Sequence, residues 1–313
     1  MKAAIINNFG SPDVFKIEEL PEPVPASNEV LVEVKASSVN PVDWKSRKGH
    51  HRLILGAPFP IVLGYDLAGI VKKTGKNITR FKPGDRVYGR SDKKYGGAYA
   101  ELAVTSEYTL AMMPKELNFE EAAAIPLACL TALQGLRDKA GLKKEDRVLI
   151  IGASGGVGHF ALQCAKIFGA NITAVASYRH EDYIKKLQPD FFIDYTKEDF
   201  RKSVCRYQCI FDAVGKESFL TVKHLLDKNG IYITLLPRPK ILLHKFLSLF
   251  TEGKKVKTFL MKSNYRDLEW VNKHVENGNI IPRVDKVFRI NEIAEAHRYS
   301  EKGHAGGKII VSM

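Results

Sequence analysis

Short apolar runs separated by turn residues fill the first 110 positions of the chain. Runs such as MKAAIIN at 1–7 and EVLVEVKASSV at 29–39 are rich in Val and Ile, and turns such as FKPGD at 81–85 interrupt them. Such runs at short spacing are typical of a compact barrel or sandwich rather than of helices. The pattern therefore predicts a β-rich first domain.

The apolar spacing changes near residue 119, where Ala and Leu recur at helical spacing up to a glycine at 141. From there to about residue 262, runs of strand length alternate with helical patterns. The expected strands are VLIIG at 148–152, ITAVAS at 172–177, FFIDY at 191–195, CIFDAV at 209–214 and IYITLL at 231–236. The expected helices are VGHFALQCAKIFG at 157–169, EDYIKKLQ at 181–188 and LTVKHLLDKNG at 220–230. This alternation predicts an α/β domain with a doubly wound parallel sheet.

The last fifty residues have a mixed pattern. A helix is expected over LEWVNKHVENG at 268–278, then a strand, a further helix and a closing strand within GGKIIVSM at 306–313. A β-rich end favours a return of the chain to the first domain. The sequence thus predicts two domains, one formed by residues 1–121 and 263–313 and the other by residues 122–262.

A glycine-rich loop follows the first strand of the second domain, in the sequence VLIIGASGGVG at 148–158. In this position, backbone amides and a helix N-terminus hold the pyrophosphate of a dinucleotide. The loop has the spacing A-x-G-x-x-G, with alanine in place of the first glycine. The expected phosphate-binding residues are Ala153, Ser154, Gly155, Gly156, Val157 and Gly158. A tight strand-to-helix turn without a ligand is the alternative.

The end of the next strand indicates which dinucleotide binds. An acidic residue at this place accepts hydrogen bonds from the ribose of NAD. Here the strand ends in Ser177, Tyr178 and Arg179, and the first carboxylates after it are expected to open the next helix. Arginine forms charge-assisted hydrogen bonds to phosphate oxygens, so Ser177 and Arg179 favour NADPH. A solvated loop cation is the alternative for Arg179.

Composition narrows the class of protein. The apolar fraction of 45% is that of an ordinary globular chain, and the four cysteines have no zinc-finger spacing. No apolar stretch is long enough to span a bilayer and the N-terminus does not resemble a signal peptide, so a cytoplasmic location is expected. The net charge of +13 is compatible with nucleic acid, a membrane surface or a polyanionic small molecule.

Collinear segments along nearly the whole chain resemble the medium-chain dehydrogenase/reductase superfamily, and especially its zinc-independent quinone oxidoreductases and enone reductases. The matching segments are SSVNPVDWKSRKG at 37–49, PFPIVLGYDLAGIV at 58–71, FKPGDRVYG at 81–89, GGAYAELA at 96–103, AAAIPLACLTAL at 122–133, IIGASGGVGHFALQCAK at 150–166, IDY at 193–195 and GGKIIV at 306–311. The resemblance implies a GroES-like barrel interrupted by a Rossmann domain, with the active site in the cleft between them.

The zinc-dependent members of that superfamily differ from this chain at their metal ligands. They carry a cysteine where this chain has Asn40, and a Gly-His-Glu where it has Gly64, Tyr65 and Asp66. Asparagine and tyrosine are poor zinc ligands, so no metal is expected and alcohol oxidation is disfavoured. The resemblance implies hydride transfer from NADPH to a quinone, or to the β-carbon of an α,β-unsaturated carbonyl compound.

The resemblance also implies roles for residues of the first domain. Lys45 and Tyr65 match positions that line the cleft and donate hydrogen bonds to a carbonyl oxygen, and Asn40 matches a residue at the nicotinamide. A surface lysine and ordinary core packing are the alternatives for Lys45 and Tyr65. Asp43 is expected to order its loop by hydrogen bonding to the backbone.

Further cofactor contacts are expected in the second domain. Thr131 matches a cofactor-contacting threonine, and Tyr195 a wall of the pocket for adenine and the 2′-phosphate. A strand-end aromatic is the alternative for Tyr195. Val214 and Gly215 are expected along the cofactor by analogy with other doubly wound folds.

A basic, apolar segment at 238–266 has no counterpart in these expectations. A basic helix with an apolar face lies well on an anionic membrane, and a lid over the cleft or a dimer interface are the alternatives. A homodimer is expected from the family. A non-enzymatic protein that binds nucleic acid through its basic surface is the alternative function, although the basic residues are dispersed.

Overall fold

The protein is described by a computed structural model in residues 1–235 and 253–313. The backbone divides into two compact units: unit 1 is Met1–Leu130 with Lys262–Met313, and unit 2 is Thr131–Met261. The sequence predicts the first boundary at residue 121, whereas the structure groups 122–130 with unit 1. The division falls within a helix, α4 (Pro126–Gln134).

Unit 1 is mainly β-structure. Its strands are β1 (Lys2–Ile6), β2 (Phe15–Glu19), β3 (Glu29–Val39), β4 (Ile61–Val62), β5 (Asp66–Thr74), β6 (Arg86–Arg90), β7 (Leu102–Ser106), β8 (Leu110–Met112), β15 (Val284–Arg289) and β16 (Lys308–Ser312). Its helices are α1 (Pro41–Arg47), α2 (Arg52–Leu55), α3 (Phe119–Ala123), α9 (Tyr265–Glu276) and α10 (Ile293–Glu301).

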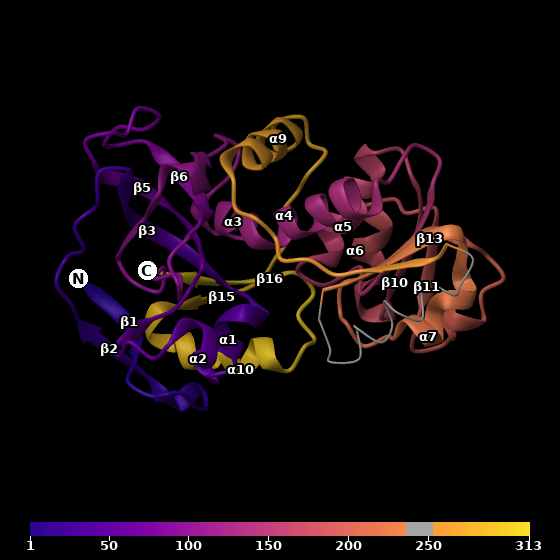
Figure 1. Cartoon of the computed structure of the whole chain (residues 1–313), viewed down its shortest axis with the longest axis horizontal. Helices are drawn as coiled ribbons and strands as arrows, with labels where there is room; N and C mark the ends of the chain where they lie inside the picture. The colour runs from indigo at the N-terminus through magenta and orange to yellow at the C-terminus, as the bar shows by residue number, and fades with distance from the viewer. Residues whose placement is uncertain (236–252) are drawn as a thin grey trace. The chain divides into compact units, whose positions relative to one another are not determined.

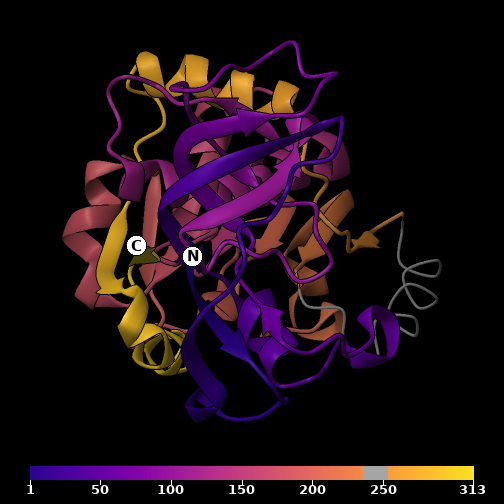
Figure 2. The ribbon, with the colours of Figure 1, turned by 90° about the vertical axis from the view of Figure 1, so that its left-hand side faces the viewer.

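The strands of unit 1 form two sheets. One has the order β2-β1-β4, and the other β15-β16-β3-β5-β6-β8 with β7 paired to β3. The C-terminal strand β16 runs antiparallel to β3, with Ile309 opposite Val39, which confirms the expected return of the chain. In Figure 1 the yellow elements β15, β16 and α10 accordingly lie beside the indigo and violet strands, and Figures 1 and 2 both show the termini close together.

Unit 2 is a parallel α/β domain, as predicted. Its strands are β9 (Arg147–Ile151), β10 (Asn171–Ala176), β11 (Phe191–Asp194), β12 (Tyr207–Asp212), β13 (Leu226–Thr234) and β14 (Lys255–Lys257). Its helices are α5 (Gly158–Ile167), α6 (Glu181–Lys186) and α7 (Phe219–Val222). The strand order β11-β10-β9-β12-β13-β14 has parallel pairs throughout. Strand β9 lies between β10 and β12, so the glycine loop is at the point where the strand order reverses, where ligands bind in such folds.

Three local predictions differ from the structure. The helical pattern at 119–142 is divided into α3, α4 and a π-helix (Gly135–Ala140), because Pro126 cannot continue a helix and instead begins α4. The helix expected at 220–230 is only α7 and one 3-10 turn, since β13 already begins at Leu226. Helix α1 was not predicted, although Pro41 is a favourable first helical residue.

Residues 238–252 of the basic segment predicted at 238–266 lie outside the described residues, as does most of the loop after β13. Its later part contains β14, which pairs with β13. Within residues 1–235 and 253–313, no helix combines the length and the apolar character needed to cross a bilayer.

Candidate active site

The glycine loop of unit 2 joins β9 to α5 without room for a side chain at its end. A Cβ on Gly158 would lie 2.0 Å from the carbonyl oxygen of Gly152, so helix α5 approaches the strand end only because residue 158 is glycine. The amides of Gly152 and Ala153 both donate to the oxygen of Val175, which ties the loop to β10. The loop is therefore held by its own backbone.

The other side of this loop is open. A Cβ on Gly155 would meet only the Gly152 oxygen, at 3.4 Å. In the described part of the chain, the amides of Ser154, Gly156 and Val157 donate to no acceptor. Free amides at the start of a ten-residue helix form a site for an anion. This donor set fits a dinucleotide pyrophosphate.

The end of β10 carries the residues expected to select the cofactor. Ser177 caps a 3-10 turn (Tyr178–His180), and its hydroxyl accepts from the Arg179 amide at 3.5 Å. Arg179 is exposed and makes no ion pair among the described residues. Tyr195, half exposed, follows β11 and donates its amide to Ala176. These three residues therefore lie at adjacent strand ends of one sheet.

The carboxylate that holds this strand end was not singled out in the sequence. Asp194 accepts the amides of Tyr178 and Thr196, at 3.1 and 3.0 Å. Burial acts to raise its pKa, but these hydrogen bonds outweigh burial and the pKa is lowered. Asp194 thus holds the turn that carries Arg179, and Lys197, over the Tyr178 ring, adds a second cation beside it.

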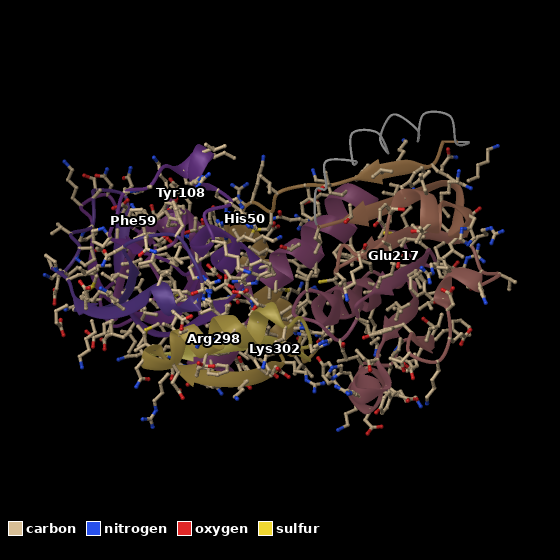
Figure 3. All side chains as sticks on the ribbon, turned by 90° about the horizontal axis from the view of Figure 1, so that it is seen from below. His50, Phe59, Tyr108, Glu217, Arg298 and Lys302 are labelled. Carbon is tan, nitrogen blue, oxygen red and sulfur yellow. The ribbon has the colours of Figure 1, made fainter. Side chains whose placement is uncertain are left out.

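Val214, of the predicted pair Val214 and Gly215, lies against the glycine loop. A Cβ on Gly152 would be 2.3 Å from the Val214 side chain. The buried carboxylate of Asp212 accepts the amides of Val214, Gly215 and Glu217 at 2.7–3.2 Å, and the hydroxyl of Tyr232 at 2.9 Å. Asp212 therefore shapes the loop that ends at Glu217, which is labelled in Figure 3. The DAVG sequence at a strand end was an available signal for this residue.

Thr131, the remaining predicted cofactor contact, lies on α4 and is almost fully buried. It is the first residue of unit 2, directly after the part of α4 that belongs to unit 1.

In unit 1, helix α1 begins at a capped turn. The amide of Asn40 donates to Asp43 Oδ2 at 2.7 Å, so Asp43 orders this turn as expected. Asp43 Oδ1 is buried and accepts no hydrogen bond in the described part of the chain. Burial raises the pKa of Asp43 to about 7.

The side chain of Asn40 is buried and fully hydrogen-bonded within unit 1. Its Nδ2 donates to Asp66 Oδ2 at 2.9 Å and its Oδ1 accepts from Lys308 Nζ. Lys308 and Asp66 form an ion pair with 3.6 Å between Nζ and Oδ2, and both side chains are almost completely buried. Both ends of the Asn40 side-chain amide are thus hydrogen-bonded within unit 1, and the nicotinamide contact that the resemblance implies stays a prediction.

Lys45 and Tyr65 differ in whether their polar atoms have partners within the described residues. Lys45 is half-buried on α1 and makes no ion pair within the described residues. Burial lowers the pKa of its ammonium. Tyr65 is 5% exposed and donates its hydroxyl to the Lys94 oxygen at 2.6 Å, under the guanidinium of Arg90. The tyrosine proton is thus already placed, whereas the Lys45 ammonium, 5.4 Å from the centroid of the Trp44 ring, donates no hydrogen bond among the described residues.

Metal-binding groups are not gathered at this site. Over residues 1–235 and 253–313, no three His, Cys, Asp or Glu side chains lie close enough together to hold a metal ion. Asn40, Tyr65 and Asp66, which by the resemblance match the metal-ligand segments of the zinc-dependent enzymes, make the contacts described above.

Comparison with known proteins covers nearly the whole chain. Family models described as "Alcohol dehydrogenase GroES-like domain" and "Zinc-binding dehydrogenase" match residues 26–115 and 187–311. The chloroplast envelope quinone oxidoreductase homolog of Arabidopsis thaliana is 35% identical over 303 residues, covering 94% of this chain and 92% of that protein. The chloroplastic NADPH-dependent alkenal/one oxidoreductase of the same plant is 33% identical over 334 residues, covering 99% and 79%.

A solved structure agrees with this similarity. The quinone oxidoreductase from Coxiella burnetii has a TM-score of 0.93 at 30% sequence identity, covering 100% of this chain and 99% of that one.

Proposed function

Because the chain belongs to the quinone oxidoreductase and enone reductase branch of the medium-chain dehydrogenase/reductase superfamily, we propose that it is an NADPH-dependent reductase of quinones or α,β-unsaturated carbonyl compounds. The glycine loop is the observation that carries the cofactor part of this proposal. Its free amides and the space beside Gly155 suit a pyrophosphate, and Val214 lies directly against it.

The preference for NADPH rests on charge at the end of β10. Arg179 has no carboxylate partner among the described residues, and Lys197 lies nearby over the Tyr178 ring. The carboxylate that holds this turn, Asp194, accepts two backbone amides and the Thr196 hydroxyl on Oδ1, and its Oδ2 lies 3.8 Å from Lys197 Nζ in an ion pair. Because no acidic residue ends β10 itself, the unpaired guanidinium of Arg179 favours a 2′-phosphate over a free hydroxyl, and the nearby Lys197 adds positive charge.

The chain's own residues suit reduction of a conjugated carbonyl. NADPH, when bound, would supply the hydride. The substrate oxygen gains negative charge as its conjugated carbon accepts the hydride, so a nearby donor stabilises the reaction. Lys45 holds three N–H donors, and the lowered pKa of its half-buried ammonium makes it a better acid. Lys45 Nζ therefore donates the proton that completes the reduction, and solvent restores it.

Tyr65 has a supporting role in this proposal. Burial raises the pKa of Tyr65 to about 12, so its hydroxyl stays protonated near neutral pH. Because that proton is donated to the backbone oxygen of Lys94, Tyr65 has a structural part in this proposal and proton donation falls to Lys45.

Turnover with defined substrates tests this function. The purified protein is mixed with NADPH and either a quinone or an enone, and the absorbance of the reduced cofactor is followed. A primary alcohol with NADP⁺ serves as the control reaction. The proposal predicts oxidation of NADPH with at least one of the two substrate classes and no reaction with the alcohol. Cofactor binding without any turnover would contradict it.

We also propose a homodimer in the cytoplasm. Static light scattering of the purified protein tests the assembly, because a mass near that of one 35.0 kDa chain would contradict a dimer. Fractionation of the source cells tests the location.

A further inference from the structure

One buried carboxylate in unit 1 binds the starts of two helices. Asp66 Oδ1 accepts the amide of Leu127 at 2.9 Å, and Leu127 is the second residue of α4. Its Oδ2 accepts Asn40 Nδ2 at 2.9 Å, and Asn40 caps α1. Ser38 also donates to Oδ2, at 2.7 Å. A single side chain on β5 therefore connects β3, α1 and α4.

Both helices begin with proline, so each lacks the N–H of its first residue. Pro126 has no N–H, so the Leu127 amide is the first donor of α4, and Asp66 accepts it. A carboxylate at this end also interacts favourably with the helix dipole. At α1, Asp66 holds the side chain of the N-cap residue Asn40, whose backbone amide donates to Asp43.

Lys308 fixes the orientation of the Asn40 side-chain amide. The β16–β3 register, with Ile309 opposite Val39, places Lys308 beside Asn40. An ammonium only donates hydrogen bonds, so it must face Asn40 Oδ1, which turns Nδ2 toward Asp66. It also neutralises a carboxylate that is completely removed from water.

We propose that Asp66, with Lys308 as its buried counter-ion, is a positioning residue that fixes the starts of α1 and α4 and thereby the places of Lys45 and Thr131. This inference rests on the proposed reductase function. Lys45 follows the anchored Asn40 by five residues, and Thr131 follows the anchored Leu127 by four, each on the same helix. A shift at either anchor is therefore carried along the helix to the predicted site residue.

Variants of the Asp66–Lys308 ion pair separate an effect on the stability of the fold from an effect on the positions of Lys45 and Thr131. Asp66→Asn and Lys308→Met each leave one buried charge without a partner, so each lowers the melting temperature strongly. The double variant has neither charge, so its melting temperature recovers most of this loss. In wild type, the Leu127 amide and Asn40 Nδ2 bind separate oxygens of Asp66. The amide that Asp66→Asn introduces has only one acceptor oxygen, so it cannot hold both donors in this way, and the helix starts are no longer fixed together.

The double variant is then compared with wild type in turnover and in NADPH binding. Positioning predicts that kcat stays about 10- to 100-fold low in the double variant, with a several-fold weaker Kd for NADPH. Asp267→Asn, at the capped start of α9 in the same unit, is the matched control and is expected to lower stability without changing kcat. If the double variant does not fold, Lys308→Arg takes its place, with a small change in melting temperature and a several-fold lower kcat expected.

The results for wild type and for the double variant decide this inference and the proposed function separately. Recovery of both melting temperature and kcat in the double variant would show that Asp66 and Lys308 only stabilise the fold, and would overturn the inference. A wild type that binds NADPH without turnover would overturn the proposed function, and the Kd of the double variant would then decide the inference. A wild type that binds no NADPH would overturn both.

Discussion

At the scale of single residues, the position of a residue in the sequence does not show whether the polar atoms of its side chain already have hydrogen-bond partners. Asn40 and Lys45 were both expected at the reacting centre, yet all polar atoms of Asn40 are used within unit 1, whereas the ammonium of Lys45 is unpaired among the described residues. Asn40 is hydrogen-bonded to Asp66 and Lys308, and both of these partners are distant from it along the chain. No local pattern predicts such pairings, because they depend on strand register.

Lys45 has a distinct expected effect on the pH profile. Lys45→Met should lower kcat about 100-fold or more, the usual contribution of a positioned acid. In wild type, kcat should fall as pH rises through the pKa of Lys45, below the usual 10.5 because burial lowers it. Lys45→Arg should move this fall to higher pH. Lys48→Met, on a lysine already paired with Glu301, is the control, and an unchanged alkaline limb in Lys45→Arg would contradict the assignment.

Arg179 should discriminate between the two cofactors. Arg179→Ala should weaken NADPH binding about ten-fold or more and leave NADH binding nearly unchanged, because only NADPH carries the 2′-phosphate. Fluorescence titration with each cofactor measures both affinities. Arg201→Ala, an exposed arginine of unit 2 that already pairs with Asp199, should change neither. Equal losses for both cofactors would remove Arg179 from the phosphate site.

At the scale of elements, the glycine loop was predictable and helix α1 was not. A loop between an apolar strand and an apolar helix has a local signature, and the structure places it at the reversal of strand order in unit 2. Helix α1 has only seven residues and follows directly on an eleven-residue strand. Its stability comes from its cap and its buried side chains, which the periodicity of so short a segment does not reveal.

Two glycines in one loop give a matched pair of variants. Gly158→Ala should destabilise the protein and weaken NADPH binding, because its Cβ would lie 2.0 Å from the Gly152 oxygen. Gly155→Ala should leave the melting temperature nearly unchanged, since its Cβ meets that oxygen only at 3.4 Å, yet it should weaken NADPH binding by filling the pyrophosphate side of the loop. Thermal melts with and without NADPH measure both effects. Undiminished NADPH binding in Gly155→Ala would contradict the cofactor site.

At the scale of the whole molecule, the return of the C-terminus was predicted and its anchoring was not. A closing β-pattern indicated that the chain rejoins the first domain, and β16 does so on β3. The completely buried guanidinium of Arg47 on α1 is further paired with Glu301 on α10, 254 positions away. In Figure 3, Arg298 and Lys302 mark this yellow C-terminal segment.

The Arg47–Glu301 pair predicts a pH-dependent contribution to stability. Burial acts to raise the pKa of Glu301, but its hydrogen bonds to Lys48 and Arg47 outweigh burial and lower it. The stabilisation is therefore complete above the unfolded-state pKa near 4.5 and is lost as pH falls through the folded-state value. Glu301→Gln should reduce the free energy of unfolding by roughly 2 kcal/mol at neutral pH and by much less in acid.

Urea denaturation of wild type and Glu301→Gln at neutral and acidic pH measures this difference. Glu295→Gln, in an exposed pair with Arg298, is the control and should have little effect at either pH. The same loss for Glu301→Gln at both pH values would show that its carboxylate charge does not contribute.

Transfer of a labelled hydride tests the central claim most directly. An enone is incubated anaerobically with the protein and NADPH deuterated at the transferable position, and the product is analysed by mass spectrometry and NMR. The account predicts one deuterium at the β-carbon of a saturated ketone, with the other new hydrogen derived from solvent. A saturated ketone without deuterium, or no reduced product from either an enone or a quinone, would contradict it.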